Sequence, residues 1–80
     1  MLKIIGSSYC KDTVAALETL KNNNTEYEFY DVSTDMNNLR KYLELRENEE
    51  VFIKVRAEKR IGFPCFILDN GKITFDIEEI

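Results

Sequence analysis

The chain has 80 residues, of which 44% are hydrophobic and 32% are charged, and it contains no histidine. A chain of this length builds one hydrophobic core, so we expect a single domain over residues 1–80. The net charge is −4, and the basic residues are dispersed among acidic ones. This excludes the basic surface that nucleic-acid binding requires.

The N-terminal segment and the two cysteines indicate the compartment. Residues 1–6 form too short an apolar run for a signal peptide, and no segment reaches the roughly 20 apolar residues of a membrane span. We therefore expect a cytoplasmic monomer without membrane contact. Both cysteines are expected to be free because cytosolic thiols are kept reduced, and we expect no metal site.

A strand and a helix are predicted at the start of the chain. Residues 3–6 form a short apolar run that ends at Gly6, which indicates a buried strand followed by a turn. From residue 11 to residue 23 apolar residues recur at helical spacing, and three asparagines then favour a stop. The expected buried face of this helix contains Val14, Leu17 and Leu20, with Ala15 and Ala16 beside them. Cys10 lies at the boundary between strand and helix.

The middle of the chain predicts a second strand and a second helix. Residues 26–32 are rich in aromatic and β-branched side chains, which is typical of a strand. Asp35 and its neighbours provide an N-cap for a helix that carries Leu39, Tyr42, Leu43 and the stem of Arg46. Residues 50–59 alternate like a strand but also fit a helical turn or two, and we predict a helix. The strand–helix–strand order predicts a parallel strand pair.

The C-terminal part predicts a hairpin. Two apolar runs, residues 63–68 and 72–75, flank Asn70 and Gly71. An Asn-Gly pair between apolar runs indicates a type I′ turn, in which both central residues have positive φ. Only a half-turn is expected over residues 77–80. The predicted fold is therefore α/β, with a parallel pair of strands and a C-terminal hairpin.

The position of Cys10 predicts a reactive thiol. A cysteine in the first turn of a helix lies near unpaired N–H groups and the positive end of the helix dipole, which favour the thiolate. Lys11 adds a positive charge beside the sulfur and Asp12 a negative one, so their net effect has no predictable sign. Thr13 lies one helical turn on, and its hydroxyl either donates to the thiolate or bonds its own backbone.

Two segments resemble the glutaredoxin branch of the thioredoxin-like superfamily. One is Ser-Ser-Tyr-Cys-Lys-Asp-Thr over residues 7–13, at the head of a helix. The other is Gly-Phe-Pro-Cys-Phe-Ile over residues 62–67, leading into a hairpin. The resemblance implies a thioredoxin-like three-layer fold, in which helices flank a small mixed sheet. It also implies that Cys10 is the nucleophile and that Pro64 follows a cis peptide bond.

The chain departs from the family pattern at two points. Thr13 stands where the family often has a second cysteine, so the motif is a monothiol Cys-x-x-Thr variant. After the hairpin, glutaredoxins have a Gly-Gly pair and acidic residues that accept the glutamyl end of glutathione. Here residues 75–79 carry bulky side chains instead. The resemblance implies glutathione as a co-substrate, but this segment weakens that implication.

The resemblance implies roles for the residues around Cys10. Thr13 would assist catalysis, and Tyr9, Lys11, Phe63 and Pro64 would flank a substrate. Cys65 is either a plain core residue or a resolving thiol near Cys10, provided that the Cα atoms lie within about 7 Å.

Three functions remain open. The first is a thiol–disulfide oxidoreductase that acts on protein or glutathione disulfides in cell redox homeostasis, without a bound cofactor. The second is a degenerate thioredoxin-fold binding module without redox turnover. The third is an iron–sulfur carrier of the monothiol glutaredoxin type.

Overall fold

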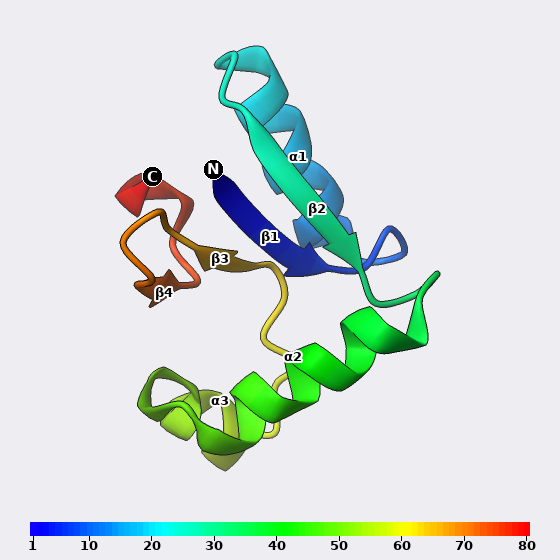
Figure 1. The fold of residues 1–80 in the computed structure, drawn as a ribbon, viewed down its shortest axis with the longest axis vertical. Helices are drawn as coiled ribbons and strands as arrows, with labels where there is room; N and C mark the ends of the chain where they lie inside the picture. Colours follow the sequence, from blue (N-terminus) through cyan, green and yellow to red (C-terminus); the bar gives the residue numbers. More distant parts are fainter.

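The computed structural model describes residues 1–80 and contains a four-stranded sheet in the order β2-β1-β3-β4 (Figure 1). Strand β1 (Leu2–Gly6) pairs in parallel with β2 (Tyr27–Asp31). Strand β3 (Cys65–Ile67) is antiparallel to β1, and β4 (Ile73–Thr74) is antiparallel to β3. The sheet is thus mixed, as predicted, and β1 pairs with both β2 and β3.

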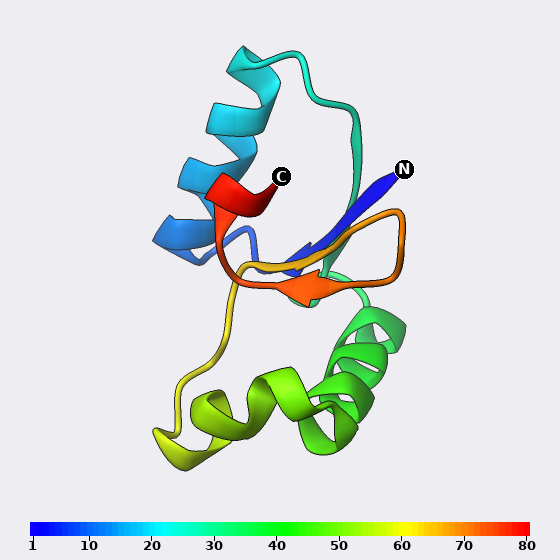
Figure 2. The ribbon, with the colours of Figure 1, turned by 90° about the vertical axis from the view of Figure 1, so that its left-hand side faces the viewer.

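Helices cover both faces of this sheet. Helix α1 lies on one face, and α2 and α3 lie on the other (Figure 2). A short C-terminal 3-10 turn, η2, lies beside α1. The bounds are α1 (Lys11–Asn22), α2 (Met36–Asn48), η1 (Glu50–Phe52), α3 (Ile53–Ala57) and η2 (Ile77–Glu79). This arrangement confirms the three-layer α/β fold.

The sheet separates two hydrophobic clusters. The cluster on the α1 face contains Leu2, Ile4, Ala16, Leu20 and Phe66. The cluster on the α2 and α3 face contains Ile5, Tyr42, Phe52, Val55 and Cys65. Successive residues of a strand point to opposite faces, so the neighbours Ile4 and Ile5 contribute to different clusters.

Helix α2 begins at the predicted N-cap. Asp35 is the N-cap residue, and its side chain accepts a hydrogen bond from the Asn37 N–H at 2.8 Å. Tyr42 is buried as expected, whereas Leu43 is 45% exposed. The helix predicted over residues 50–59 is present as η1 followed by α3. The longest helix has 13 residues, and no helix is a candidate for spanning a lipid bilayer.

The turn of the hairpin differs from the prediction. The N–H of Gly71 donates to the carbonyl of Leu68 at 2.9 Å, so Asp69 and Asn70 are the central residues of the turn. Only Gly71, with φ +88°, has positive φ there, and Asn70 does not. A negative φ at both central residues followed by a left-handed glycine is the three-residue loop with a bulge. The type I′ prediction is therefore wrong, although the hairpin itself is present.

The buried face of α1 also differs from the prediction. Val14 is 41% exposed, and Thr13 is fully buried in its place. The reason lies at the end of β1, where a Cβ atom on Gly6 would approach the Thr13 Oγ1 to 2.6 Å. Thr13 fills the space that the missing side chain of Gly6 leaves, and this contact fixes the rotation of the helix.

Candidate functional site

Cys10 is held at the junction of β1 and α1 by a tight turn. Its N–H donates to the Ser7 carbonyl at 3.0 Å, and its own carbonyl accepts from the Val14 N–H at 3.0 Å. Cys10 is the N-cap residue of α1 and is half-buried. Its sulfur therefore lies near the positive end of the helix dipole, as the sequence predicts.

The surroundings of Cys10 lower the pKa of its thiol. Burial alone raises this pKa, but hydrogen bonding from the backbone N–H and the hydroxyl of Thr13 and from the backbone N–H of Asp12 outweighs it. The Asp12 carboxylate raises the pKa in smaller measure. The Cys10 side chain makes no N-cap hydrogen bond in this conformation. The net shift is downward, which increases the thiolate fraction at neutral pH.

Thr13 connects this thiol to the framework. It has no exposed surface, and its Oγ1 accepts a hydrogen bond from the Ser7 N–H at 3.4 Å. The hydroxyl thus bonds a backbone group six residues earlier rather than its own helix, while it also helps to lower the pKa of Cys10. One side chain therefore fixes the turn and stabilises the thiolate.

A polar network that the sequence did not reveal holds the same turn from the β2 side. The Asp31 carboxylate accepts from the Ser33 N–H at 2.9 Å and from the Ser8 N–H at 3.3 Å. The hydroxyls of Ser7 and Ser33 share a hydrogen bond. Burial raises the pKa of Asp31, but hydrogen bonds from Ser8 and Ser33 outweigh it and lower the pKa overall. The network keeps Asp31 ionised and ties the two loops together.

A groove of about 500 Å³ opens beside Cys10. The peptide bond between Phe63 and Pro64 is cis, as the resemblance implies. Among the residues that the sequence singled out, the groove brings together Cys10, Phe63 and Pro64. The complete lining is Cys10, Asp12, Arg60, Ile61, Gly62, Phe63, Pro64 and Phe75.

The wall of the groove opposite α1 is positioned by Tyr42. The hydroxyl of Tyr42 donates to the Ile61 carbonyl at 2.5 Å, and its ring lies 4.8 Å from the ring of Phe63. Gly62 has φ +80°, and a Cβ atom there would approach the Tyr42 hydroxyl to 2.5 Å. Gly62 is therefore required both by its conformation and by the close approach of α2.

Tyr9 and Lys11 lie on the other side of Cys10. Both line a second hollow of about 440 Å³, to which Cys10, Val14 and Glu18 also contribute. Tyr9 is 87% exposed, in agreement with the turn position that the sequence assigns to it. Cys10 thus contributes to the lining of both hollows.

Cys65 is a core residue at the start of β3. It has no exposed surface and belongs to the cluster on the α2 and α3 face of the sheet, whereas Cys10 begins the helix on the opposite face. Burial raises the pKa of the Cys65 thiol to about 12. Both cysteines are free. Of the two roles predicted for Cys65, its burial and its raised pKa favour the plain core residue.

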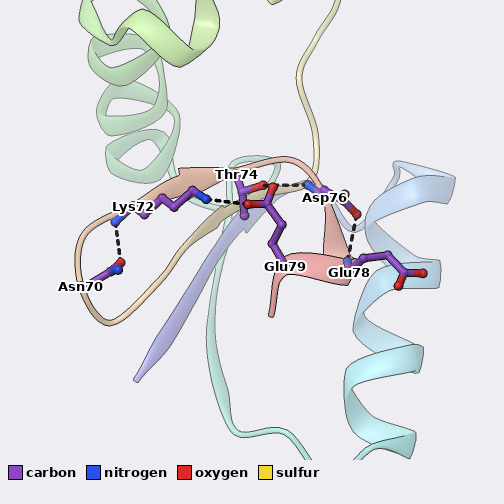
Figure 3. Close-up of polar contacts among 6 residues, drawn as sticks. All are labelled: Asn70, Lys72, Thr74, Asp76, Glu78 and Glu79. Carbon is purple, nitrogen blue, oxygen red and sulfur yellow. Dashed lines mark hydrogen bonds and ion pairs between the residues drawn. The ribbon is translucent and has the colours of Figure 1, made fainter.

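The segment after β4 forms a closed network of its own (Figure 3). The Asp76 N–H donates to the Thr74 hydroxyl at 3.1 Å, and the Glu78 N–H donates to the Asp76 carboxylate at 2.9 Å. The Glu79 carboxylate accepts from Thr74 at 2.5 Å and from Lys72 at 2.6 Å. These two side chains lower the pKa of Glu79. The side chains of this segment therefore occupy donors that a ligand would otherwise use.

Comparison with known proteins adds the family. A sequence model of the glutaredoxin family matches residues 2–73. A relative from Haemophilus influenzae, described as an uncharacterized protein, is 25% identical over 71 residues, which cover 89% of this chain and 83% of that protein. No solved structure matches the chain significantly. Because the family match covers most of a chain that also has the three-layer fold and the cis-proline groove, the chain belongs to the glutaredoxin family.

Proposed function

We propose that this protein is a glutaredoxin-like thiol–disulfide oxidoreductase that uses Cys10 as its only nucleophile. In the first step the Cys10 thiolate attacks one sulfur of a disulfide, and a new bond forms between that sulfur and the Cys10 Sγ. The original S–S bond breaks, and the departing thiolate takes a proton from solvent. The product is a mixed disulfide on Cys10.

An external thiol completes the cycle, because Thr13 has no sulfur and Cys65 lies in the core. The incoming thiolate attacks the mixed disulfide and releases the Cys10 thiolate. A second external thiol reduces the disulfide formed in this step. Two thiols are thus oxidised to one disulfide for each disulfide reduced. Free glutathione is a candidate for this external thiol.

The lowered pKa of Cys10 carries the proposal. The thiolate is the nucleophile in disulfide exchange, and a thiol whose pKa approaches the ambient pH attacks best. The helix N-terminus and Thr13 provide this shift, and the groove gives a disulfide access to the sulfur. Membership of the glutaredoxin family supports a redox role of this kind.

Adduct formation with a small symmetrical disulfide tests the proposal. Wild type and Cys65→Ala are expected to gain one adduct at Cys10, detected by intact-mass spectrometry and peptide mapping. Cys10→Ser is expected to gain none under native conditions. The adduct is expected to disappear when free thiol is added.

Either of two results would contradict the proposal. The first is an adduct located on Cys65 in the native protein. The second is adduct formation at Cys10 that is no faster than at an ordinary exposed thiol. That result would favour the binding module without redox turnover.

A further inference from the structure

We propose that the disulfide attacked by Cys10 is carried by a polypeptide with apolar side chains beside its half-cystine, and that the groove does not recognise glutathione. This inference rests on the proposed function and assigns its substrate class. It follows from three features around Cys10: the charges in the groove, the occupied donors after β4, and the apolar side chains on both sides of the sulfur.

The charges in the groove are unfavourable for glutathione, whose two carboxylates need cations or N–H donors. Arg60 is the single cation in the lining, and its Nε already lies 2.6 Å from a carboxylate oxygen of Glu58. Asp12 adds a carboxylate to the same groove, close to the sulfur. A ligand that enters here therefore meets one cation that is already engaged through its Nε and one acid without an ion-pair partner, while Lys11 lines the second hollow and not this groove.

Two backbone donors beyond the groove are also occupied. Phe75 lines the groove, and the chain continues from it into the η2 turn. The Asp76 N–H is bound by the Thr74 hydroxyl, and the Glu78 N–H is bound by the Asp76 carboxylate (Figure 3). Asp76 itself would repel a carboxylate that approached these groups. A glutamyl end therefore finds these two donors occupied and a carboxylate beside them.

Apolar side chains are instead exposed on both sides of Cys10. Ile61 is 66% exposed in the lining of the groove, while Tyr9 is 87% and Val14 is 41% exposed in the second hollow. The two hollows measure about 500 and 440 Å³, and both are open at the surface. A polypeptide extends in both directions from its half-cystine, so it can fill both hollows while its sulfur meets Cys10.

Exchange kinetics with matched probes test this assignment. The probes are a glutathione–thionitrobenzoate mixed disulfide and two peptide–thionitrobenzoate disulfides, one with leucine and phenylalanine beside the cysteine and one with serines. All three release the same coloured thiolate, so the leaving group cancels in the comparison. We expect wild type to react roughly tenfold faster with the apolar peptide than with either other probe, which corresponds to about 1.4 kcal/mol.

The readout for the variants is the ratio of the apolar-peptide rate to the glutathione rate. This ratio is expected to fall toward one in Tyr9→Ser and in Ile61→Ser. Leu43→Ser is the control, because Leu43 is exposed to a similar degree as Val14 but lines neither hollow; it is expected to retain the wild-type ratio. Rates are measured below the concentration of half-saturation, so that they report the second-order constant.

The outcomes separate this inference from the proposed function. If Cys10 reacts rapidly with all three probes at the same rate, or fastest with glutathione, the substrate assignment is overturned and the oxidoreductase remains. An unchanged ratio in both Tyr9→Ser and Ile61→Ser also overturns the assignment. If no probe reacts faster with Cys10 than with an ordinary thiol, the proposed function fails and this inference fails with it.

Discussion

At Cys10, burial and hydrogen bonding act on the pKa in opposite directions, and hydrogen bonding prevails. Two of the three stabilising contacts come from Thr13, through its N–H and its hydroxyl. The hydroxyl is also the acceptor for the Ser7 N–H in the preceding turn. Thr13 is thus coupled to both the chemistry and the local stability of the site.

Replacing Thr13 by valine tests the effect of the hydroxyl on the Cys10 pKa and on stability without changing the shape of the side chain. Thr13→Val keeps the branched side chain but removes the hydroxyl, so the pKa of Cys10 is expected to rise. The buried Ser7 N–H loses its acceptor, and stability is expected to fall by about 1–3 kcal/mol. Thiolate absorbance against pH and urea unfolding measure the two changes.

Thr13→Ser retains the hydroxyl and is expected to keep the pKa near that of wild type. Equal pKa values in wild type and Thr13→Val would contradict this role.

The raised pKa of Cys65 makes stability depend on alkaline pH. An acid whose folded pKa is about 12, against an ordinary value of 9.0, binds its proton more tightly when folded. Its contribution is fully present below pH 9 and is lost as the pH rises toward 12, by about 1.4 kcal/mol for each pH unit. Tyr42 lies in the same cluster. Its pKa is also raised, mainly by burial and in smaller measure by the Cys65 thiolate.

Comparison with Cys65→Ala isolates the contribution of Cys65. We expect the stability difference between wild type and Cys65→Ala, measured by urea unfolding, to shrink as the pH rises above 9. The groups common to both proteins, Tyr42 included, largely cancel in this difference. A difference that stays constant up to pH 11 would show that Cys65 is not held in an apolar environment.

Among the elements, the segment before β3 has a conformation that depends on a neighbouring helix. Gly62 and Gly71 both have positive φ, but only Gly62 has atoms within reach of an added Cβ, the nearest being the Tyr42 hydroxyl at 2.5 Å. The two glycines therefore form a matched pair that differs in packing alone.

Alanine substitutions at the two glycines are expected to have different consequences. Gly71→Ala is expected to cost about 1–2 kcal/mol, the penalty of a left-handed conformation. Gly62→Ala is expected to cost more than Gly71→Ala, and it should also slow disulfide exchange because it displaces the groove wall. Urea unfolding and the exchange rate measure these effects. Equal stability losses with equal exchange rates would contradict the account of the groove wall.

Sequence patterns predicted the elements better than their contacts. The strand–helix junction at Cys10, the Asp35 cap and the presence of the hairpin follow from local patterns, and the cis bond before Pro64 follows from the resemblance. The prediction of a type I′ turn was wrong because, within the turn, only Gly71 has a positive φ.

The parts that sequence reasoning missed depend on tertiary contacts. The rotation of α1 depends on the gap beside Gly6, which no helical periodicity encodes. The Asp31 network and the Arg60 and Ile61 wall join segments far apart in the chain. Asp31 at the end of a predicted strand, followed by Ser33, was the available signal for the network.

At the scale of the whole molecule, β1 links the two hydrophobic clusters. Ile4 belongs to the α1 face and Ile5 to the α2 and α3 face, and both are almost fully buried. Neither face can lose its packing without exposing the central strand. The chain is therefore expected to unfold as one cooperative unit.

Paired substitutions in β1 test this cooperativity. Ile4→Val and Ile5→Val are each expected to reduce stability by about 0.5–1.5 kcal/mol, with a single urea transition that coincides by circular dichroism and tyrosine fluorescence. Two separate transitions in either variant, one for each face of the sheet, would show that the clusters fold independently.

The central claim is that Cys10 is an activated nucleophile, and the pH dependence of its alkylation tests this most directly. In a Cys65→Ala background, the rate of iodoacetamide alkylation is measured against pH for the native protein and for the same protein unfolded in urea. We predict a native midpoint below the unfolded one, because the folded structure lowers the pKa of Cys10. A native midpoint equal to or above that of the unfolded chain would contradict the account.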